Sequence, residues 1–568
     1  MTDDTAQLLL FAAAIAGLTP VLGLYMARIY AGQRTWLTPL LHPVEQFIYR
    51  LTGITPENEQ HWTRYAFSVI LLNLVAVLVF YLILRLQHLL PLNPRVFTGL
   101  DPALAFNVTI SFITSTNWQA YAGETTLSYF SQMAGCTVHN FISTGTAMAV
   151  AMAVIRGITT SQTRTLGNFH VDFVRTVLYV LLPISLIVAA VLSFEGVPQN
   201  LGDYQIVKTV EGPEQLIPQG PVASQTAIKM FGTNGGGFFN ANGAHPYENP
   251  TPVSNFLQAL LMLLIPASLT YTFGTMAGDT RQGWALFAAM SLLFALGLAV
   301  VYTSEGAGNS LLASLPIDQT SGNMEGKEVR FGTAGSALWA VTSTATASGA
   351  VNSMLDSYTP IGGLVPMMNV QLSEVIFGGA GSGFYNLLFY IVLAVFLAGL
   401  MVGRSPVYLG KRIEVREIKL AVITLLVVPI GMLLLPAVAI MIPSAASAIQ
   451  DPGPHGLSEM LYAYASATAA NGSAFAGFDG SAPFHLTAQP LAMLVGRYAF
   501  IISGLAIAGS LGAKRTAVVS TGAVPTHSPL FVVLMVSVIF IFGAIGFFPA
   551  IALGPLAEHF EMLAGKTF

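Results

Sequence analysis

Ten apolar segments of about 20 residues each constrain the fold of this 568-residue chain more than any other feature of its sequence. A helix of that length crosses the ~30 Å hydrocarbon core of a bilayer. Charged residues make up 9% of the chain, whereas soluble domains carry roughly 25%. The sequence therefore predicts an all-α polytopic membrane protein. The ten predicted transmembrane helices are 6–27, 65–86, 132–155, 171–194, 253–277, 284–302, 385–402, 418–442, 491–511 and 530–553.

Basic residues gather in alternate connections between these spans, whereas the intervening connections are mainly acidic. The positive-inside rule places the basic connections in the cytoplasm and, with ten spans, both termini outside. The chain starts with an acidic segment, so we expect a retained first helix and not a cleaved signal. Fifteen of the 23 lysines and arginines form the basic set: Arg28, Arg34, Arg50, Arg64, Arg156, Arg164, Arg175, Arg281, Arg404, Lys411, Arg412, Arg416, Lys419, Lys514 and Arg515.

The composition also argues against several functional classes. A net charge of −4 gives no support to nucleic-acid binding. The single cysteine, Cys136, excludes an intrachain disulfide and any multi-cysteine metal site. The chain contains neither a Gly-x-x-x-x-Gly-Lys-Ser/Thr phosphate loop nor an Asp-Lys-Thr-Gly-Thr phosphorylation motif. We therefore expect no catalytic site for ATP hydrolysis and no organic cofactor in this chain.

Four segments share one order of elements: an apolar helix, a loop, a shorter semi-apolar stretch, a turn rich in Gly, Asn, Thr and Ser, and a second apolar helix. With Thr116, Asn234, Ser348 and Gly472 taken as equivalent, the spacings are 118, 114 and 124 residues. Such a period indicates an internal repeat. The predicted organisation is an N-terminal extra helix and cytoplasmic linker (1–64), four repeats (65–158, 171–277, 281–403 and 417–512) and a C-terminal extra helix (528–568).

The stretch before each turn is too short to cross a bilayer. Its copies at 102–114, 222–232, 334–346 and 458–468 have 11 to 13 residues and reach only ~17–20 Å as helices. We expect four re-entrant pore helices that turn back near the middle of the membrane. Backbone carbonyls at such turns can replace the hydration shell of a cation. The turns contain no acidic side chain, which favours a weakly hydrated monovalent ion over calcium.

The glycines of the turns support the same interpretation. Gly235, Gly236, Gly237, Gly349 and Gly472 suit backbone with positive φ. Each turn taken alone is more typical of an ordinary external loop. The common period of all four favours a pore with four-fold pseudo-symmetry.

Four motifs contain these turns: Thr116-Asn-Trp-Gln-Ala-Tyr-Ala-Gly-Glu124, Phe231-Gly-Thr-Asn-Gly-Gly-Gly-Phe-Phe-Asn240, Ser348-Gly-Ala-Val-Asn-Ser353 and Asn471-Gly-Ser-Ala-Phe-Ala-Gly477. Together with Ala398-Gly-Leu-Met-Val-Gly-Arg404 and Leu409-Gly-Lys-Arg412, they resemble the KdpA family, the potassium-translocating subunits of the bacterial Kdp complex, a P-type potassium ATPase. The resemblance extends from Leu18 to Gly543. It implies four potassium-channel-like helix–pore–helix units in one chain, one extra helix at each end, and a bacterial plasma (inner) membrane location.

The resemblance further implies that potassium, the transported substrate, is bound mainly by backbone carbonyls of the four turns. The expected binding residues are Ser115, Thr116, Thr233, Asn234, Ala347, Ser348, Asn471 and Gly472. The expected supporting residues are Asn117, Gln119, Gly232, Gly235, Gly236, Gly349 and Ser473. Ser115 and the pair Ala347–Ser348 stand where Asn and Ser-Cys are usual in the family. Carbonyl coordination does not depend on these side chains.

The function implied is potassium-selective binding and translocation in an ATP-driven, high-affinity uptake pump. The implied partners are a P-type ATPase catalytic subunit of the KdpB kind, which uses the ATP, small single-span accessory subunits of the KdpC and KdpF kinds, and the lipid membrane. The alternative is a stand-alone potassium channel or cation symporter of the same superfamily.

Four polar residues near the predicted pore have two interpretations each. Arg497 lies within a predicted span, where a charge costs at least ~2.5 kcal/mol. We expect it to form a positive gate beneath the fourth turn; the alternative is a structural bridge between helices. For Lys229, a structural charge is favoured over a pore residue, and for Glu374 a solvated outer loop is favoured. Gln119 suits contact with the filter and a scaffolding role equally well.

Overall fold

The structure is a computed structural model that describes residues 3–312, 315–403, 405–516 and 525–566. Within these residues, ten helices are long and apolar enough to cross a membrane, which confirms the predicted ten spans. They are α1 (Asp3–Tyr30); α3 (Trp62–Leu86); η2 (Ser131–Thr137) with α6 (Val138–Thr159); α7 (Phe169–Arg175) with η3 (Thr176–Leu181) and α8 (Leu182–Phe194); α10 (Pro252–Met276); α11 (Thr280–Gly306); α14 (Ser382–Val402); α15 (Val415–Pro429) with η7 (Ile430–Leu434) and α16 (Leu435–Ile440); α19 (Pro483–Ala513); and α20 (Pro529–Ile551) with η8 (Ala552–Leu556) and α21 (Ala557–Leu563).

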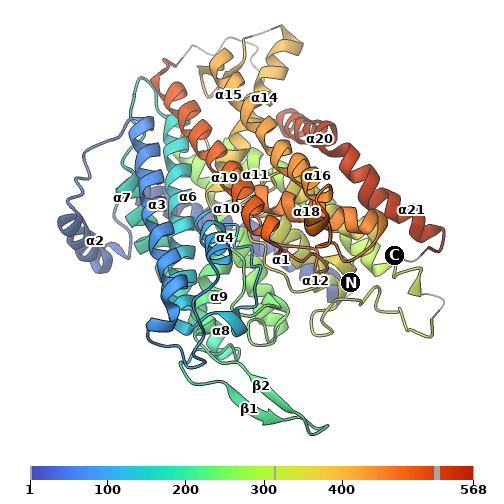
Figure 1. Cartoon of the computed structure of the whole chain (residues 1–568). Coiled ribbons are helices and arrows are strands. Elements are labelled where there is room, and N and C mark those ends of the chain that lie inside the picture. Colours follow the sequence, from blue (N-terminus) through green and yellow to red (C-terminus); the bar gives the residue numbers. More distant parts are fainter. Residues whose placement is uncertain (1–2, 313–314, 404, 517–524, 567–568) are drawn as a thin grey trace.

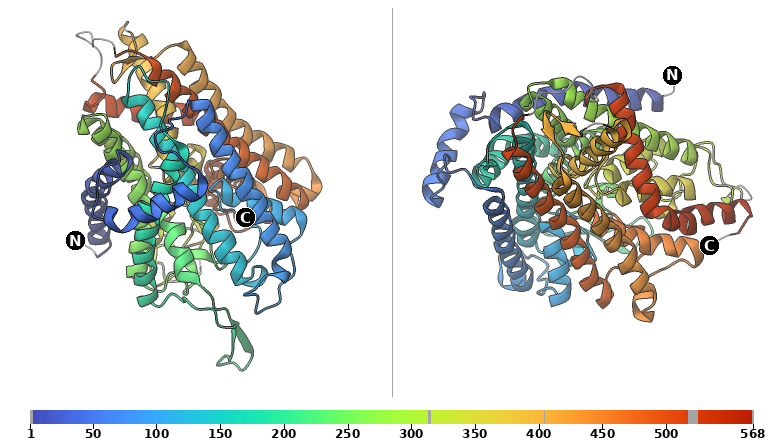
Figure 2. Two further views of the ribbon diagram at one scale, coloured as in Figure 1. Left: turned by 90° about the vertical axis from the view of Figure 1, so that its left-hand side faces the viewer. Right: turned by 90° about the horizontal axis from the view of Figure 1, so that it is seen from above.

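The spans form one bundle of tilted helices (Figures 1 and 2). A hairpin of β1 (Gln205–Lys208) and β2 (Glu214–Ile217) projects from it at the bottom of Figure 1. Both chain ends lie at the lower right of that view, whereas the connection between α14 and α15 lies at the top. The connections between the spans also contain α2 (Thr38–Thr52), η1 (Gln87–Leu89), α5 (Gly123–Thr126), η4 (Asn242–Ala244), η6 (Leu355–Ser357), β3 (Val407–Tyr408), β4 (Lys411–Arg412) and α17 (Pro443–Ala446).

The core of the bundle lies around the η2–α6 span, where 83% of the residues in an 18-residue apolar stretch are buried. Glycine lets neighbouring spans approach closely there, as small residues do in membrane helix packing. A Cβ atom at Gly157 of α6 would lie 2.5 Å from the carbonyl oxygen of Ala508 in α19. These two helices therefore pack backbone to backbone at this point.

The connections with the predicted basic residues contact one another. The Gln60 N–H donates to the Gly167 carbonyl (2.7 Å), and Lys411 Nζ donates to the Gly157 carbonyl (2.8 Å). Two further contacts join the remaining connections: Gln162 N–H to Lys514 O (3.1 Å), and Gln282 Nε2 with His527 Nδ1 (3.3 Å). The basic connections thus share one face of the molecule, as their alternation predicts. Arg404 of this set lies outside the described residues.

The four stretches predicted as pore helices are helical. They form α4 (Pro102–Ile113), α9 (Val222–Phe231), α12 (Gly332–Ala345) and α18 (Gly453–Thr468), of 12, 10, 14 and 16 residues. α18 begins five residues before the predicted start at 458, because Pro454 fits the first turn of a helix, where no intrahelical N–H is needed. α4 packs against α3 and α19, α9 against α8 and α10, α12 against α10 and α11, and α18 against α19. Each short helix is therefore enclosed by spans.

The segment that follows α12 differs from those that follow the other three short helices. After its turn, α13 (Pro360–Gln371) forms a further helix, and an irregular segment separates it from α14. Ser373, Glu374 and Phe377 of that segment have positive φ. The expectation of a solvated outer loop at Glu374 is wrong, because the residue is only 4% exposed. A buried, irregular backbone thus replaces a continuous helix at this point.

Candidate ion-binding site

Each of the four short helices ends in a turn with left-handed backbone. Gly235, Gly236, Gly349 and Gly472 have positive φ as predicted, whereas Gly237 does not. Positive φ also occurs at Ser115 (62°), Asn117 (52°), Thr233 (51°) and Ala470 (56°), which the glycine pattern does not predict. This conformation costs a non-glycine residue about 1–2 kcal/mol, and such strain persists where the surroundings enforce it.

The turns touch one another in a cyclic order. A Cβ atom at Gly235 of the second turn would lie 1.4 Å from the carbonyl oxygen of Ser348 in the third. A Cβ atom at Gly349 would lie 1.9 Å from the Asn471 carbonyl oxygen, and one at Gly472 would lie 1.8 Å from the Thr116 carbonyl oxygen. Each of these glycines therefore has the carbonyl of the next turn against its Cα. We call this arrangement the glycine–carbonyl ring.

The ring corrects the predicted equivalence of the fourth turn. Gly472 contacts the next carbonyl as Gly235 and Gly349 do, so its neighbour Asn471 matches Ser348 and Thr116. The predicted equivalence of Gly472 with those residues is therefore shifted by one position. The sequence does not reveal this, because the flanking residues of the fourth turn are small and similar.

The first and second turns are joined by side chains instead of by a glycine. Asn117 stands where the other turns have glycine, and its Nδ2 donates to the Gly235 carbonyl (3.0 Å) and to Asn140 Oδ1 (2.8 Å). Gln119 Nε2 donates to the Gly237 carbonyl (2.8 Å), and its Oε1 accepts from the Gly237 N–H (2.8 Å). We call this junction the Asn117 seam. Gln119 thus holds the second turn through the backbone of Gly237.

Two asparagines fix the other turns. Asn234 Nδ2 donates to Ser143 Oγ (3.0 Å), and its Oδ1 accepts from Thr144 Oγ1 (2.9 Å). Asn471 Nδ2 donates to the carbonyls of Ser343 (2.9 Å) and Thr346 (2.8 Å) of the third unit. The carbonyls of both residues remain free of these side-chain contacts.

The other predicted residues are equally buried. Thr233 Oγ1 accepts from the Ala380 N–H (2.7 Å), and Ser473 Oγ donates to Asn471 Oδ1 (2.5 Å). A Cβ atom at Gly232 would lie 2.5 Å from Thr144 Oγ1. Ala347 and Ser348 are at most 1% exposed. Side chains in the turns thus hold the backbone in place.

Lys229 of α9 stabilises the second turn from behind. Its Nζ donates to the Gly236 carbonyl (2.8 Å) and to Asn242 Oδ1 (2.9 Å), and it forms an ion pair with Glu248. Burial lowers the pKa of Lys229, and the Glu248 carboxylate opposes that shift. The structural interpretation of this charge is correct, since its nitrogen is fully engaged in these contacts.

The turns separate two spaces. A vestibule of about 810 Å³ is lined by Asn117, Gly236, Gly349 and Gly472, one residue from each turn. On the other side, Glu374 and Arg497 line a cavity of about 10 Å³, about the room of one water molecule. Arg497 Nη2 donates to Ser115 Oγ (3.3 Å). The arginine therefore lies below the first turn as well as beside the end of α18.

Glu374 shares the small cavity with Arg497. It accepts hydrogen bonds from the Gly379 N–H (3.1 Å) and from Ser382 Oγ. Burial raises the pKa of Glu374, and the charge of Arg497 opposes the shift. A buried acidic side chain and a buried guanidinium thus share one small cavity beside the turns.

This arrangement suits a dehydrated monovalent cation. Four backbone turns meet at the base of one vestibule, and no carboxylate lies in any of them. Each turn follows the C-terminal end of a helix, which carries about half a negative charge. The sequence analysis did not predict that Asn117 joins two turns. The feature that could have indicated this is that Asn117 aligns with glycine in the other three turns, at Gly235, Gly349 and Gly472.

Comparisons with known proteins give one family. Residues 9–560 match the family model described as KdpA, potassium-transporting ATPase A subunit. Proteins named potassium-transporting ATPase potassium-binding subunit are 55% identical in Rhodospirillum centenum (100% of this chain, 99% of the relative) and 52% identical in Mesorhizobium japonicum (99% of each). The fold is similar to the potassium transporter TrkH of Vibrio parahaemolyticus, with a TM-score of 0.52 and 13% identity over 88% of this chain and 98% of that one.

Proposed function

Because this chain belongs to the KdpA family, the potassium-transporting ATPase A subunits, we propose that it binds extracellular potassium selectively and passes it to an ATP-hydrolysing partner. The observation that carries this proposal is the meeting of four turns, joined by the glycine–carbonyl ring, at the base of one vestibule. Backbone carbonyls of Ser115, Thr116, Thr233, Asn234 and their counterparts in the third and fourth turns would replace the water around the ion.

The proposal includes four re-entrant pore helices and a four-fold pseudo-repeat with the boundaries given above. Their support is that α4, α9, α12 and α18 have at most 16 residues, ~24 Å of helix, and are enclosed by spans. The relation of the third turn to the fourth, and of the fourth to the first, repeats the contact of the second with the third.

The proposed orientation places the shared basic face in the cytoplasm of a bacterial cell, with the chain in the inner membrane. The vestibule and both termini then face outward. Arg497 and Glu374 lie on the cytoplasmic side of the turns, where the arginine would act as a positive gate against direct passage of potassium. The arginine would also have a structural role, since it donates a hydrogen bond to Ser115 in the first turn.

The partners proposed are a KdpB-like catalytic subunit and KdpC-like and KdpF-like accessory subunits, as the relatives' names point to an ATPase complex. The alternative, a stand-alone channel or symporter, is supported only by the fold shared with TrkH.

Potassium-stimulated ATPase activity of the complex, purified through a tag on this chain, distinguishes the two functions. Stimulation by potassium and not by sodium is expected of a pump subunit. A chain that purifies alone and conducts potassium in liposomes would contradict the pump and support the channel or symporter.

A further inference from the structure

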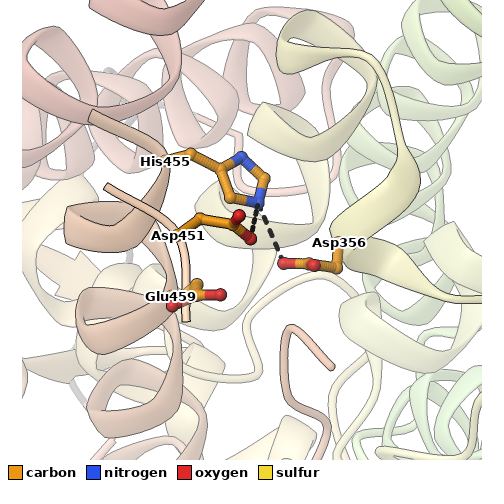
Figure 3. Close-up of side chains that lie close together, drawn as sticks. All are labelled: Asp356, Asp451, His455 and Glu459. Carbon is orange, nitrogen blue, oxygen red and sulfur yellow. Dashed lines mark hydrogen bonds and ion pairs between the residues drawn. The ribbon is translucent and has the colours of Figure 1, made fainter. Parts of the chain in front are cut away.

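Four side chains outside the filter region converge at the junction of the third unit, α18 and the C-terminal helix (Figure 3). Asp451 precedes α18, His455 and Glu459 lie one helical turn apart within it, and Asp356 comes from η6. One nitrogen or oxygen atom from each lies within 4.8 Å of all the others. The spacing of four residues places the histidine and glutamate on one face of the helix.

The distances fit a metal ion. Ligands at about 2.1 Å from a common ion lie about 3.0–3.4 Å apart when adjacent and about 4.2 Å apart when opposite. His455 Nε2 lies 3.0 Å from Asp356 Oδ1 and 3.9 Å from Asp451 Oδ2. His455 Nε2 and the two aspartates therefore already have separations close to those of ligands around one ion, and one oxygen of Glu459 lies within 4.8 Å of them.

Glu459 gives an independent indication of a missing ligand. Its side chain is completely buried, yet Oε1 has no hydrogen-bond partner among the described residues. Its other oxygen accepts from the Gln450 N–H (3.0 Å). An uncompensated buried carboxylate oxygen is costly, and Figure 3 shows this carboxylate facing the same space as the two aspartates.

The histidine is oriented as metal-binding histidines usually are. His455 Nδ1 lies 2.9 Å from Glu558 Oε1 of α21. A carboxylate on one ring nitrogen holds the imidazole so that the other nitrogen can bind a metal. The imidazole also stacks on the Phe475 ring, with ring centroids 6.1 Å apart and an angle of 24° between the ring planes.

We propose that Asp356, Asp451, His455 and Glu459 bind a divalent transition-metal ion, with Glu558 as the carboxylate that orients the histidine. One imidazole nitrogen with three carboxylates suits Mn²⁺ or Zn²⁺ better than Mg²⁺ or Ca²⁺. The ion would connect η6, α18 and α21. It would also brace the vestibule wall, since Phe475 stacks on Tyr462 and Tyr462 hydrogen-bonds Ser473 Oγ (2.7 Å).

The test uses Mn²⁺ as the probe and the complex purified through a tag on this chain, with excess Mg²⁺ to occupy magnesium sites of the ATPase partner. Electron paramagnetic resonance should detect one tightly bound Mn²⁺ per chain. Asp451→Asn and Glu459→Gln should each weaken binding at least ~10-fold. The exposed-site control Glu211→Gln, in the β1–β2 hairpin, should bind as the wild type does.

The electron spin-echo signal of the bound Mn²⁺ should show modulation from an imidazole nitrogen, and His455→Gln should abolish it. Size-exclusion chromatography checks that each variant still assembles. The substitution at Asp451 should disturb the fold least, because that side chain is partly exposed. Absence of tightly bound Mn²⁺, or binding that these variants leave unchanged, would overturn the metal site and leave a histidine paired with two carboxylates.

Discussion

Gly235 shows how strictly the contact between two turns limits a single residue. Its φ of 65° lies in the left-handed region, and a Cβ atom there would lie 1.4 Å from the Ser348 carbonyl oxygen. Two separate costs therefore fall on any substitution: backbone strain of about 1–2 kcal/mol and a clash with the backbone of the next turn. Relief of that clash requires the third turn to move.

Gly235→Ala should therefore raise the potassium concentration for half-maximal ATPase stimulation at least ~10-fold, equivalent to about 1.4 kcal/mol. The matched control is Gly53→Ala, because Gly53 has nearly the same φ (68°) but no atom within 4 Å of the added Cβ. If Gly235→Ala responded to potassium as the wild type does, Gly235 would not be part of a potassium-binding filter.

Gln119→Leu should weaken potassium binding through the Asn117 seam. The substitution leaves the buried N–H and carbonyl of Gly237 without their partners, at a cost of about 1–3 kcal/mol. The expected loss is roughly 5- to 150-fold in potassium affinity, measured by isotope binding to the complex. An unchanged affinity together with unchanged stability would show that the seam does not control the turns.

At the scale of elements, a buried ion pair stabilises α9 and the turn that follows it. α9 carries Lys229, whose ion pair with Glu248 is at most 1% exposed. Removal of one partner of a buried pair costs about 3–5 kcal/mol because the other charge remains uncompensated. The second turn depends on this pair, since the same nitrogen binds the Gly236 carbonyl.

Lys229→Met should lower the thermal stability of the purified complex, and Lys229→Met combined with Glu248→Gln should recover much of it. Differential scanning fluorimetry of detergent-solubilised complex measures both. If the double variant were as unstable as the single one, the loss would come from packing or from the Gly236 contact and not from the unpaired carboxylate.

The elements that the sequence predicts are those that depend on local pattern. Apolar length predicts all ten spans, and turn composition with a common period locates the four turns. The helix α13 and the burial of the segment after it were not predicted, because Ser373 to Gly381 resembles an external loop until its burial is known. The cluster at His455 was missed because Asp356 and Glu558 lie far away in sequence; only Asp451-x-x-x-His-x-x-x-Glu459 is a local signal.

At the scale of the whole molecule, the alternating basic connections predict one orientation. They contact one another on a single face, so a single labelling experiment reports on all of them. Cys136 is completely buried and should give little background. Exposed positions are available on both sides, at Glu57 beside Gln60 and at Glu211 in the β1–β2 hairpin.

In intact cells, a membrane-impermeant maleimide should label Glu211→Cys and spare Glu57→Cys, and permeabilisation should expose both. The physical reason is the cost of moving the basic connections across the membrane. The reverse labelling pattern would place the vestibule on the cytoplasmic side and contradict uptake from outside.

The Asn117 seam also gives the ring a mechanical asymmetry. At three of the junctions between turns, a backbone carbonyl packs directly against a glycine, so neither turn can move closer. At the fourth junction, the side-chain amides of Asn117 and Gln119 bridge the two turns. Side-chain torsions yield more easily than close-packed backbone. The junction between the first and second turns is therefore the one at which the turns can shift most easily relative to each other.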